Sequence, residues 1–159
     1  MNVNEIAPKR IAIALINGPN INLLGTREQQ FYGKETLPDI EKQIKSLADE
    51  LLVDILLYQS NHEGQIVDFI QENRFTLDGI MINPAAYTKS GYAILEALTA
   101  IDIPFIEVHL SNIFSREKWH SESIFSPKAI GFISGMKGFS YELSLRGIVN
   151  YINDNKNNE

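Results

Sequence analysis

The sequence predicts an α/β fold in which helices cover both faces of a parallel sheet. Short apolar runs such as Ile11–Ile16 have the length of strands and contain almost no polar residues, as strands buried on both faces do. Segments with an apolar residue at every third or fourth position follow these runs, as expected of helices. The two patterns alternate along the 159 residues, and this alternation is typical of parallel sheets.

Five strands are predicted, over residues 11–16, 53–58, 77–82, 104–109 and 129–133. Asn83-Pro84 ends the third strand, because proline cannot donate to a central ladder. Helices are predicted over residues 36–51, 66–70, 90–101 and 141–152, with a short helix over 113–119. Thr36 suits the N-cap of the first helix and Pro38 its first turn. Five strands joined in this way favour a flavodoxin-like, doubly wound sheet in the order 2-1-3-4-5.

Composition indicates a single domain over residues 1–159, with frayed tails at 1–9 and 153–159. Hydrophobic residues make up 44% and charged residues 21%, which is enough for a packed core. The net charge of −6, without a basic stripe, argues against nucleic-acid binding. The absence of cysteine excludes disulfides and thiolate zinc sites and suits a cytoplasmic protein. No apolar run reaches the roughly 18 residues of a membrane span, and residues 1–10 are too short for a signal peptide.

In doubly wound folds, ligands bind beyond the carboxyl ends of the strands, where the strand order reverses. Four loops are expected there, after Ile16, Tyr58, Ile82 and Val108. Their polar residues are Asn17, Arg27, Tyr32, Asn61, His62, Glu63, Asn83, Tyr87, Thr88, Lys89, Glu107, His109, Ser111, Asn112 and Arg116. We therefore expect the functional side chains to converge on one edge of the sheet.

The first of these loops, residues 16–33, is unusually long for a compact domain. It fits either an Ω-like surface loop with its own small core or a lid that carries Arg27 and Tyr32 over a pocket. Tyrosine normally titrates near pH ~10. A guanidinium within about 4–6 Å would favour the phenolate, which can remove a proton alpha to a carbonyl.

Glu107 and His109 are two residues apart on a predicted strand and therefore project to the same face. A carboxylate beside an imidazole fixes the ring and favours its protonated form, as a general acid requires. An ordinary salt bridge at a strand end would show the same pattern. No phosphate-binding loop, serine nucleophile motif or metal-ligand spacing of histidines is present in the sequence.

Four segments of the sequence together resemble the type II 3-dehydroquinate dehydratases, or type II dehydroquinases. They are residues 17–33, 58–64, 83–88 and 106–113, the last followed by Arg116-Glu117, with a weaker match over 129–141. The resemblance implies a flavodoxin-like fold and the anti elimination of water from 3-dehydroquinate to 3-dehydroshikimate through an enolate. It also implies a reaction without metal or organic cofactor, a place in the shikimate pathway, and trimers assembled into a dodecamer.

Residue by residue, the resemblance implies that Tyr32 is the base that takes the C2 proton and that Arg27 stabilises the transition state. Asn17 would hold the water that stabilises the enolate oxygen, and His109, oriented by Glu107, would protonate the leaving hydroxyl. The implied substrate-binding residues are Asn83, Lys89, Glu96, Leu110, Ser111, Arg116 and His120.

Several positions depart from the pattern of this family. Lys89 stands where the family usually has a histidine, Glu96 where it has an aspartate that reaches a neighbouring subunit, and Trp119-His120 where it has Phe-Arg. Residues 135–137 also alter a Gly-Phe-Gly. A lysine paired with a longer anion would be a compensating change. These departures leave open a divergent homologue with weak or altered activity, or a ligand-binding protein that is not an enzyme.

Overall fold

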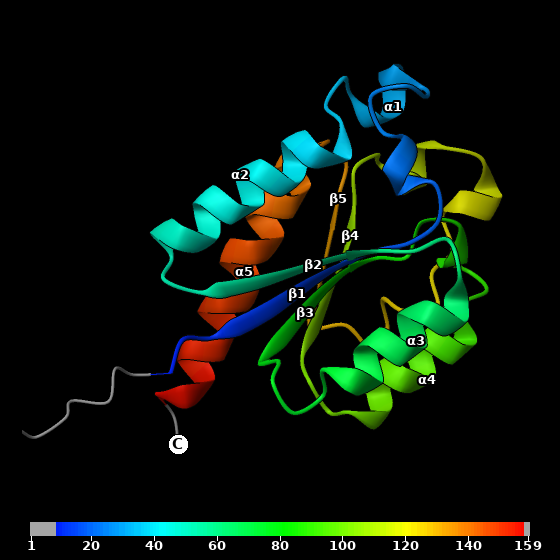
Figure 1. Ribbon diagram of the computed structural model, residues 1–159. Coiled ribbons are helices and arrows are strands. Elements are labelled where there is room, and N and C mark those ends of the chain that lie inside the picture. The colour runs from blue at the N-terminus through cyan, green and yellow to red at the C-terminus, as the bar shows by residue number, and fades with distance from the viewer. Residues whose placement is uncertain (1–8, 158–159) are drawn as a thin grey trace, which may run out of the picture.

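The computed structural model describes residues 9–157, whose helices and strands alternate along the chain (Figure 1). The strands are β1 (Ala12–Asn17), β2 (Asp54–Gln59), β3 (Gly79–Asn83), β4 (Phe105–His109) and β5 (Gly131–Ser134). The α-helices are α1 (Gln29–Tyr32), α2 (Leu37–Glu50), α3 (Glu63–Glu72), α4 (Tyr92–Ala100) and α5 (Phe139–Lys156). The 3-10 helices are η1 (Ile21–Leu23), η2 (Ala85–Tyr87), η3 (Ile113–Ser115) and η4 (Lys118–His120).

The strands form one parallel sheet in the order β2-β1-β3-β4-β5, which confirms the predicted topology. The register places Asn17 at the end of β1 beside Asn83 at the end of β3. At the other side of the sheet, His109 of β4 lies beside Ser134 of β5. The polar residues that end these strands are therefore collected at one edge, as the sequence predicted.

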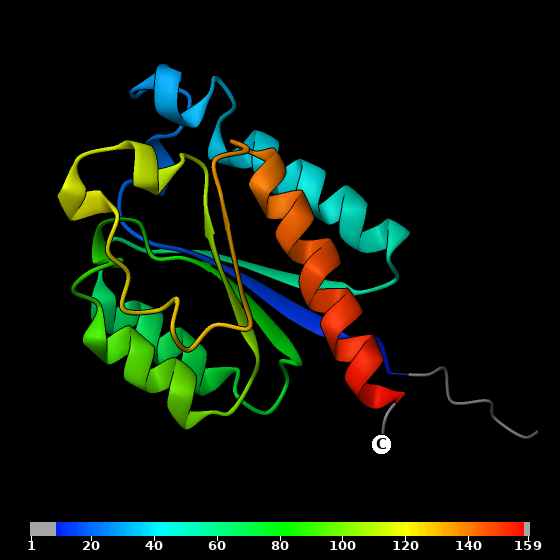
Figure 2. The ribbon, with the colours of Figure 1, turned by 180° about the vertical axis from the view of Figure 1, so that it is seen from behind.

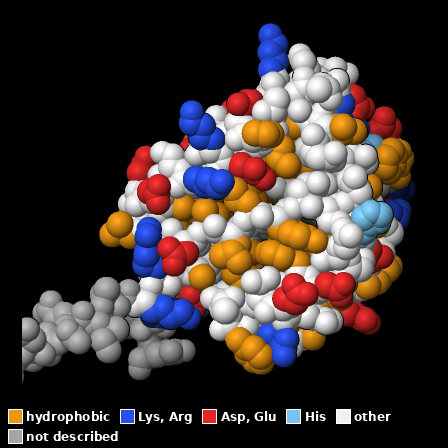
Figure 3. All heavy atoms as spheres, viewed as in Figure 1, with side chains coloured by type: hydrophobic (Ala, Val, Ile, Leu, Met, Phe, Trp, Pro, Cys, Tyr) orange, Lys and Arg blue, Asp and Glu red, His pale blue; other side chains and the backbone are white. Residues whose placement is uncertain are grey.

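Two layers of helices cover the sheet. Helices α2 and α5 lie on one face and α3 and α4 on the other (Figure 1), and the view from behind shows α5 running beside α2 (Figure 2). Each face has its own apolar cluster, with Ile44 and Leu145 in one and Ile70 and Leu98 in the other. The inner strands β3 and β4 are buried throughout, whereas β2 and β5 at the two edges are half-buried. Figure 3 shows apolar side chains gathered between α2 and α3, where the edge strand β2 lies.

Helix α2 begins as predicted. The Thr36 hydroxyl accepts a hydrogen bond from the Asp39 amide at 3.3 Å, and the Asp39 carboxylate accepts from the Thr36 amide at 2.9 Å. Pro38 lies in the first turn, where its missing N–H costs nothing. This capping box satisfies two backbone donors and fixes where the chain turns from the first loop into the helix.

The structure corrects the predicted C-terminal part of the chain. Helix α5 begins at Phe139 and continues to Lys156, so residues 153–156 are helical rather than frayed. Buried Ile148 and Ile152 hold its last turns against the sheet. The short helix expected over 113–119 is instead two separate 3-10 turns, because Arg116 between them has an extended backbone. Residues 1–8 and 158–159 lie outside the described residues. Within residues 9–157, no helix combines the length and the apolar composition that a membrane span requires.

Candidate active site

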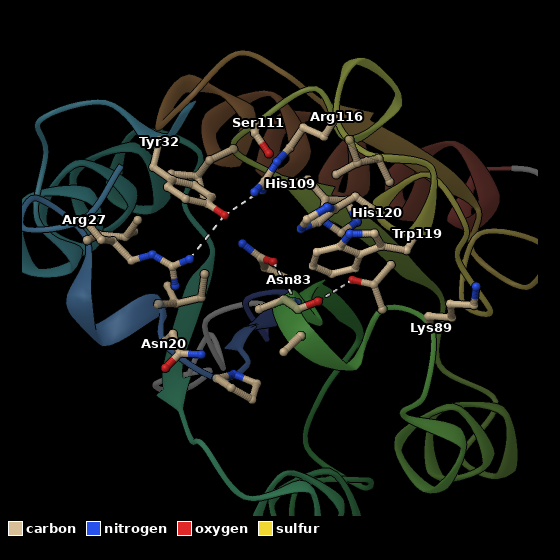
Figure 4. A pocket seen from close by; sticks show the side chains of 18 residues that line it. Asn20, Arg27, Tyr32, Asn83, Lys89, His109, Ser111, Arg116, Trp119 and His120 are labelled. Atoms are coloured by element: carbon tan, nitrogen blue, oxygen red, sulfur yellow. Dashed lines mark hydrogen bonds between the residues drawn. The ribbon is translucent and has the colours of Figure 1, made fainter. Parts of the chain in front are cut away.

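A cavity of about 310 Å³ lies at the carboxyl ends of the inner strands (Figure 4). Asn83 at the end of β3 and His109 at the end of β4 face it from the sheet, and segments 19–32 and 113–120 surround it. The predicted residues that line it are Arg27, Tyr32, Asn83, Lys89, His109, Leu110, Ser111, Arg116 and His120. Asn17, Glu107 and Glu96 are not part of the lining. The first two are buried, whereas Glu96 is exposed on α4.

Two guanidinium groups approach the hydroxyl of Tyr32 (Figure 4). Arg116 donates a hydrogen bond to the phenol oxygen through Nη1 at 2.7 Å, whereas the Arg27 contact through Nη2 is long, at 3.5 Å. The Arg27 guanidinium also lies over the Tyr32 ring, 4.8 Å from its centroid. It forms an ion pair with Glu28, with 2.8 Å between Nη2 and Oε2. The structure therefore confirms the predicted pairing of Arg27 with Tyr32 and adds Arg116 as the closer donor. Negative charge on the phenol oxygen would be flanked by two cations.

The loop that carries Tyr32 combines features of both predicted alternatives. Its first part is anchored, because Ile21 of η1 and Leu24 are buried in the core cluster beneath α2 and α5. Its second part, α1, has only four residues and buries none of them. This part ends at Gly33, whose φ of 89° is readily adopted only by glycine. The loop is thus an anchored base followed by a short, exposed cover that holds Tyr32 at the cavity.

His109 and Glu107 form the predicted pair. Nε2 of His109 lies 2.7 Å from Oε1 of Glu107, and both side chains are buried. Since Nε2 is occupied by the carboxylate, Nδ1 is the ring nitrogen left for a ligand. Two hydroxyl groups that the sequence analysis missed complete the surroundings of Glu107, because Ser123 and Ser126 both donate to its carboxylate. The signal available in the sequence was a Ser-x-x-Ser spacing after the last predicted site residue.

A second missed residue, Tyr141 of α5, joins two predicted ones. Its hydroxyl donates to Oδ1 of Asn17 at 2.6 Å and accepts from Nδ2 of Asn83 at 2.8 Å. All three side chains are buried, and burial raises the pKa of Tyr141 well above its usual value. Asn83 also accepts from the amide of Ala85 at 3.1 Å, which starts η2. This chain of hydrogen bonds fixes the amide of Asn83 at the bottom of the cavity.

Comparisons with known proteins agree with this geometry. A family model described as dehydroquinase class II matches residues 11–149. The chain is 50% identical over 144 residues to a 3-dehydroquinate dehydratase of Prochlorococcus marinus, covering 91% of this chain and 99% of that protein. It is 51% identical over 137 residues to a catabolic 3-dehydroquinase of Aspergillus clavatus, covering 86% and 91% of the two chains. The chain belongs to the class II dehydroquinase family.

A solved member of the dehydroquinase family has the same fold. The crystal structure of a type II dehydroquinase from Butyrivibrio crossotus superimposes with a TM-score of 0.85 at 40% sequence identity, covering 87% of this chain and 97% of that one. The family that the motifs indicated and the flavodoxin-like architecture are both confirmed.

Lys89 departs from the dehydroquinase pattern, and its amino group is already paired. Its Nζ lies 2.5 Å from Oε2 of Glu122, and the side chain points away from the centre of the cavity (Figure 4). Within the chain, the carboxylate that meets Lys89 is therefore Glu122 rather than Glu96. Both partners of this pair are about half exposed, so the pair contributes little to stability.

His120 occupies the position at which the dehydroquinase pattern usually has arginine. Its ring lies against Trp119, with centroids 3.4 Å apart, and its Nδ1 is 3.0 Å from the Glu117 carboxylate without the geometry of a hydrogen bond. Burial, followed by the Arg116 guanidinium, lowers the pKa of His120 below its usual value, and Glu117 offsets only part of this shift. A neutral imidazole therefore replaces the cation at this wall of the cavity near neutral pH.

Within residues 9–157, no group of three or more His, Cys, Asp or Glu side chains has the arrangement of a metal site. The carboxylates of Glu107 and Glu117 lie beside His109 and His120, respectively.

Proposed function

We propose that this chain removes water from 3-dehydroquinate to give 3-dehydroshikimate through an enolate. One observation supports this proposal above the others: Tyr32, flanked by two guanidinium groups, and His109, held by Glu107, line the same small cavity. A volume of about 310 Å³ lies at the lower end of the range for ligand pockets and suits a single hydroxylated ring acid.

In the proposed mechanism, Tyr32 acts as a phenolate that takes the C2 proton beside the ketone. Arg116 and Arg27 stabilise the charge on the phenol oxygen before this transfer. The electron pair of the broken C–H bond moves into the enolate, whose oxygen needs placed hydrogen-bond donors. In this step His109 must be the imidazolium, with one N–H at Nε2 bonded to Glu107 and the other at Nδ1 facing the cavity. It gives the Nδ1 proton to the leaving hydroxyl as the enolate collapses, so that water departs, the carbon–carbon double bond forms and His109 is left neutral.

Asn17 has an indirect role in this proposal. Its side chain accepts a hydrogen bond from buried Tyr141, which in turn accepts from Asn83 at the cavity. We therefore assign contact with the substrate to Asn83 and the backbone at Leu110 and Ser111. Asn17 acts through Tyr141 by holding Asn83 in place.

The test follows the ultraviolet absorbance of the conjugated enone product after 3-dehydroquinate is added to the pure protein. We expect steady enone formation in the wild type and none with Tyr32→Phe. Trp119 is the single tryptophan of the chain and lines the cavity, so its fluorescence reports binding separately. A flat absorbance trace combined with a fluorescence change would contradict the proposed dehydratase activity and favour a ligand-binding homologue that is not an enzyme. Lys89 and His120 are the residues that motivate this alternative.

We also propose that the protein is a cytoplasmic homo-oligomer of trimers assembled into a dodecamer. In support, Glu96 is exposed on α4 and takes no part in lining the cavity of its own chain, as expected of a residue donated to a neighbour. Sedimentation equilibrium measures the assembly directly, and a monomer at working concentrations would contradict it.

A further inference from the structure

Both oxygens of the buried Glu107 carboxylate accept hydrogen bonds from a segment far along the chain. Oε1 lies 2.7 Å from Nε2 of His109 and 2.8 Å from the hydroxyl of Ser123. Oε2 lies 2.8 Å from the same hydroxyl and 2.6 Å from the hydroxyl of Ser126. The Glu107 side chain is fully buried, so these groups replace the water that a carboxylate would otherwise require.

The hydroxyl of Ser123 is oriented by the backbone around it. It accepts hydrogen bonds from the amide of Phe125 at 3.0 Å and from the amide of Ser126 at 3.2 Å. A hydroxyl has two lone pairs and one hydrogen. Because both lone pairs are engaged, the hydrogen of Ser123 is directed to Glu107, and at this contact Glu107 accepts.

The segment that carries the two serines is fixed independently of Glu107. Phe125, between them, is fully buried in the apolar cluster beneath α3 and α4. The amide of Ile124 donates to the carbonyl of Thr88 at 3.1 Å, which ties the segment to the loop after β3. The serines are thus part of a rigid frame, and the carboxylate conforms to them.

We infer that Ser123 and Ser126 are positioning residues that select one tautomer of His109. They hold Glu107 so that Oε1 accepts a hydrogen from Nε2 of His109, which leaves Nδ1 to face the cavity. A carboxylate released from these hydroxyls would be free to rotate and to bind the imidazole in other ways. This inference rests on the proposed function only in giving His109 the part of the acid, because the geometry of the ring is independent of the reaction.

The first test measures the tautomer of His109 without using activity. The ring nitrogens of the three histidines are labelled with ¹⁵N, and the His109 signals are assigned by comparison with His109→Asn. We expect neutral His109 to carry its hydrogen on Nε2 in the wild type. In Ser123→Ala/Ser126→Ala we expect averaging between Nε2 and Nδ1. Unchanged His109 shifts in this double variant would overturn the inference.

The second test measures steady-state kinetics. Ser123→Ala and Ser126→Ala should each lower kcat about tenfold, by analogy with the outer-shell partners that orient metal-binding histidines, and leave KM within about twofold. Ser126→Thr, which retains the hydroxyl, should recover most of the loss. The matched control is Ser144→Ala, which removes another buried hydroxyl, one that donates to the Ser140 carbonyl at 2.8 Å within α5. A loss in this control equal to that in Ser126→Ala would show a general effect on the fold and refute the inference.

A double-mutant cycle separates positioning from folding. In the Glu107→Gln background there is no carboxylate to orient, so Ser126→Ala should change kcat by less than about twofold. An undiminished loss in that background would mean that Ser126 acts elsewhere. If the wild type forms no enone at all, the proposed function fails, and the ¹⁵N tautomer measurement alone then decides the inference.

Discussion

Replacing Tyr141 with phenylalanine removes one oxygen atom from the centre of the molecule and should destabilise it strongly. The hydroxyl of Tyr141 bridges the side chains of Asn17 and Asn83, to which it is hydrogen-bonded at 2.6 and 2.8 Å. These three side chains are at most 2% exposed. The phenylalanine ring fills the same space, so the effect comes from hydrogen bonding and not from a cavity.

Two buried atoms lose this partner, Oδ1 of Asn17 and Nδ2 of Asn83. Each costs about 1–3 kcal/mol, because a buried polar atom loses its compensation for the water it gave up. Together they lower the free energy of unfolding by about 2–6 kcal/mol, and a domain of this size should lose at least about 4 °C in melting temperature. The matched control is Tyr58→Phe, which removes a hydroxyl that donates to the Gln65 carbonyl at the surface, at 3.2 Å. That change should cost less than about 1 kcal/mol.

Urea unfolding followed by circular dichroism, at one fixed protein concentration, measures both variants. A loss for Tyr141→Phe no larger than that for Tyr58→Phe would refute the reasoning. A second arm uses pH. Because the folded state raises the pKa of Tyr141, its contribution to stability is present below the unfolded pKa of about 10 and is lost as pH rises further. Tyr141→Phe should therefore reduce the alkaline loss of stability seen in the wild type.

Three further outcomes are expected. Folding lowers the pKa of His120, so the unfolded chain binds the proton more tightly and stability falls as pH drops below about 6.5. His120→Gln should flatten this part of the melting-temperature profile, and an identical profile would contradict it. Glu122→Gln breaks the exposed pair with Lys89 and should leave the midpoint of urea unfolding nearly unchanged; a clear drop in the midpoint would mean that the pair is structural. Arg116→Gln removes the 2.7 Å donor to Tyr32 and should lower kcat at least about tenfold, whereas an unchanged rate of enone formation would rule out its role.

The sheet could be predicted from the sequence because its signals are local. The apolar run Ile11–Ile16 and the three- or four-residue spacing of apolar residues in α2 indicate directly which residues are buried. Thr36 and Asp39 mark the start of α2 within four residues. The C-terminus of α5 was mispredicted because its last residues are polar; Ile152 packs in the core cluster and Asn150 donates to Asp154 within the same turn, and these contacts support the helix there. The prediction of one helix over residues 113–119 was wrong because of another contact between distant residues. The backbone is extended at Arg116, whose side chain donates a hydrogen bond to Tyr32.

The candidate site was predictable in its short-range pairs and not in its long-range ones. Glu107 with His109 follows from strand alternation, and Arg27 with Tyr32 from their place in one loop. Tyr141 lies 124 residues from Asn17, and nothing in the sequence near either indicates their contact. Ser126 is 19 residues from Glu107, across a turn and the buried Phe125. When a supporting side chain comes from another element of the fold, no periodic pattern in the sequence predicts its contact with the site.

The two proposed catalytic groups are held in very different ways, and this difference has a consequence for the reaction. His109 is buried at the end of the inner strand β4, and its carboxylate partner is bonded to two hydroxyls of a segment anchored in the core. Tyr32 ends a four-residue helix without a fully buried residue; its ring is partly buried against the core cluster, and Arg116 donates a hydrogen bond to its hydroxyl at 2.7 Å. Segments with few buried contacts open at low free-energy cost. The acid is therefore set by the fold, whereas the base depends on the cover being closed. Substitutions in the cover, residues 29–33, should accordingly change kcat/KM without altering the protonation of His109.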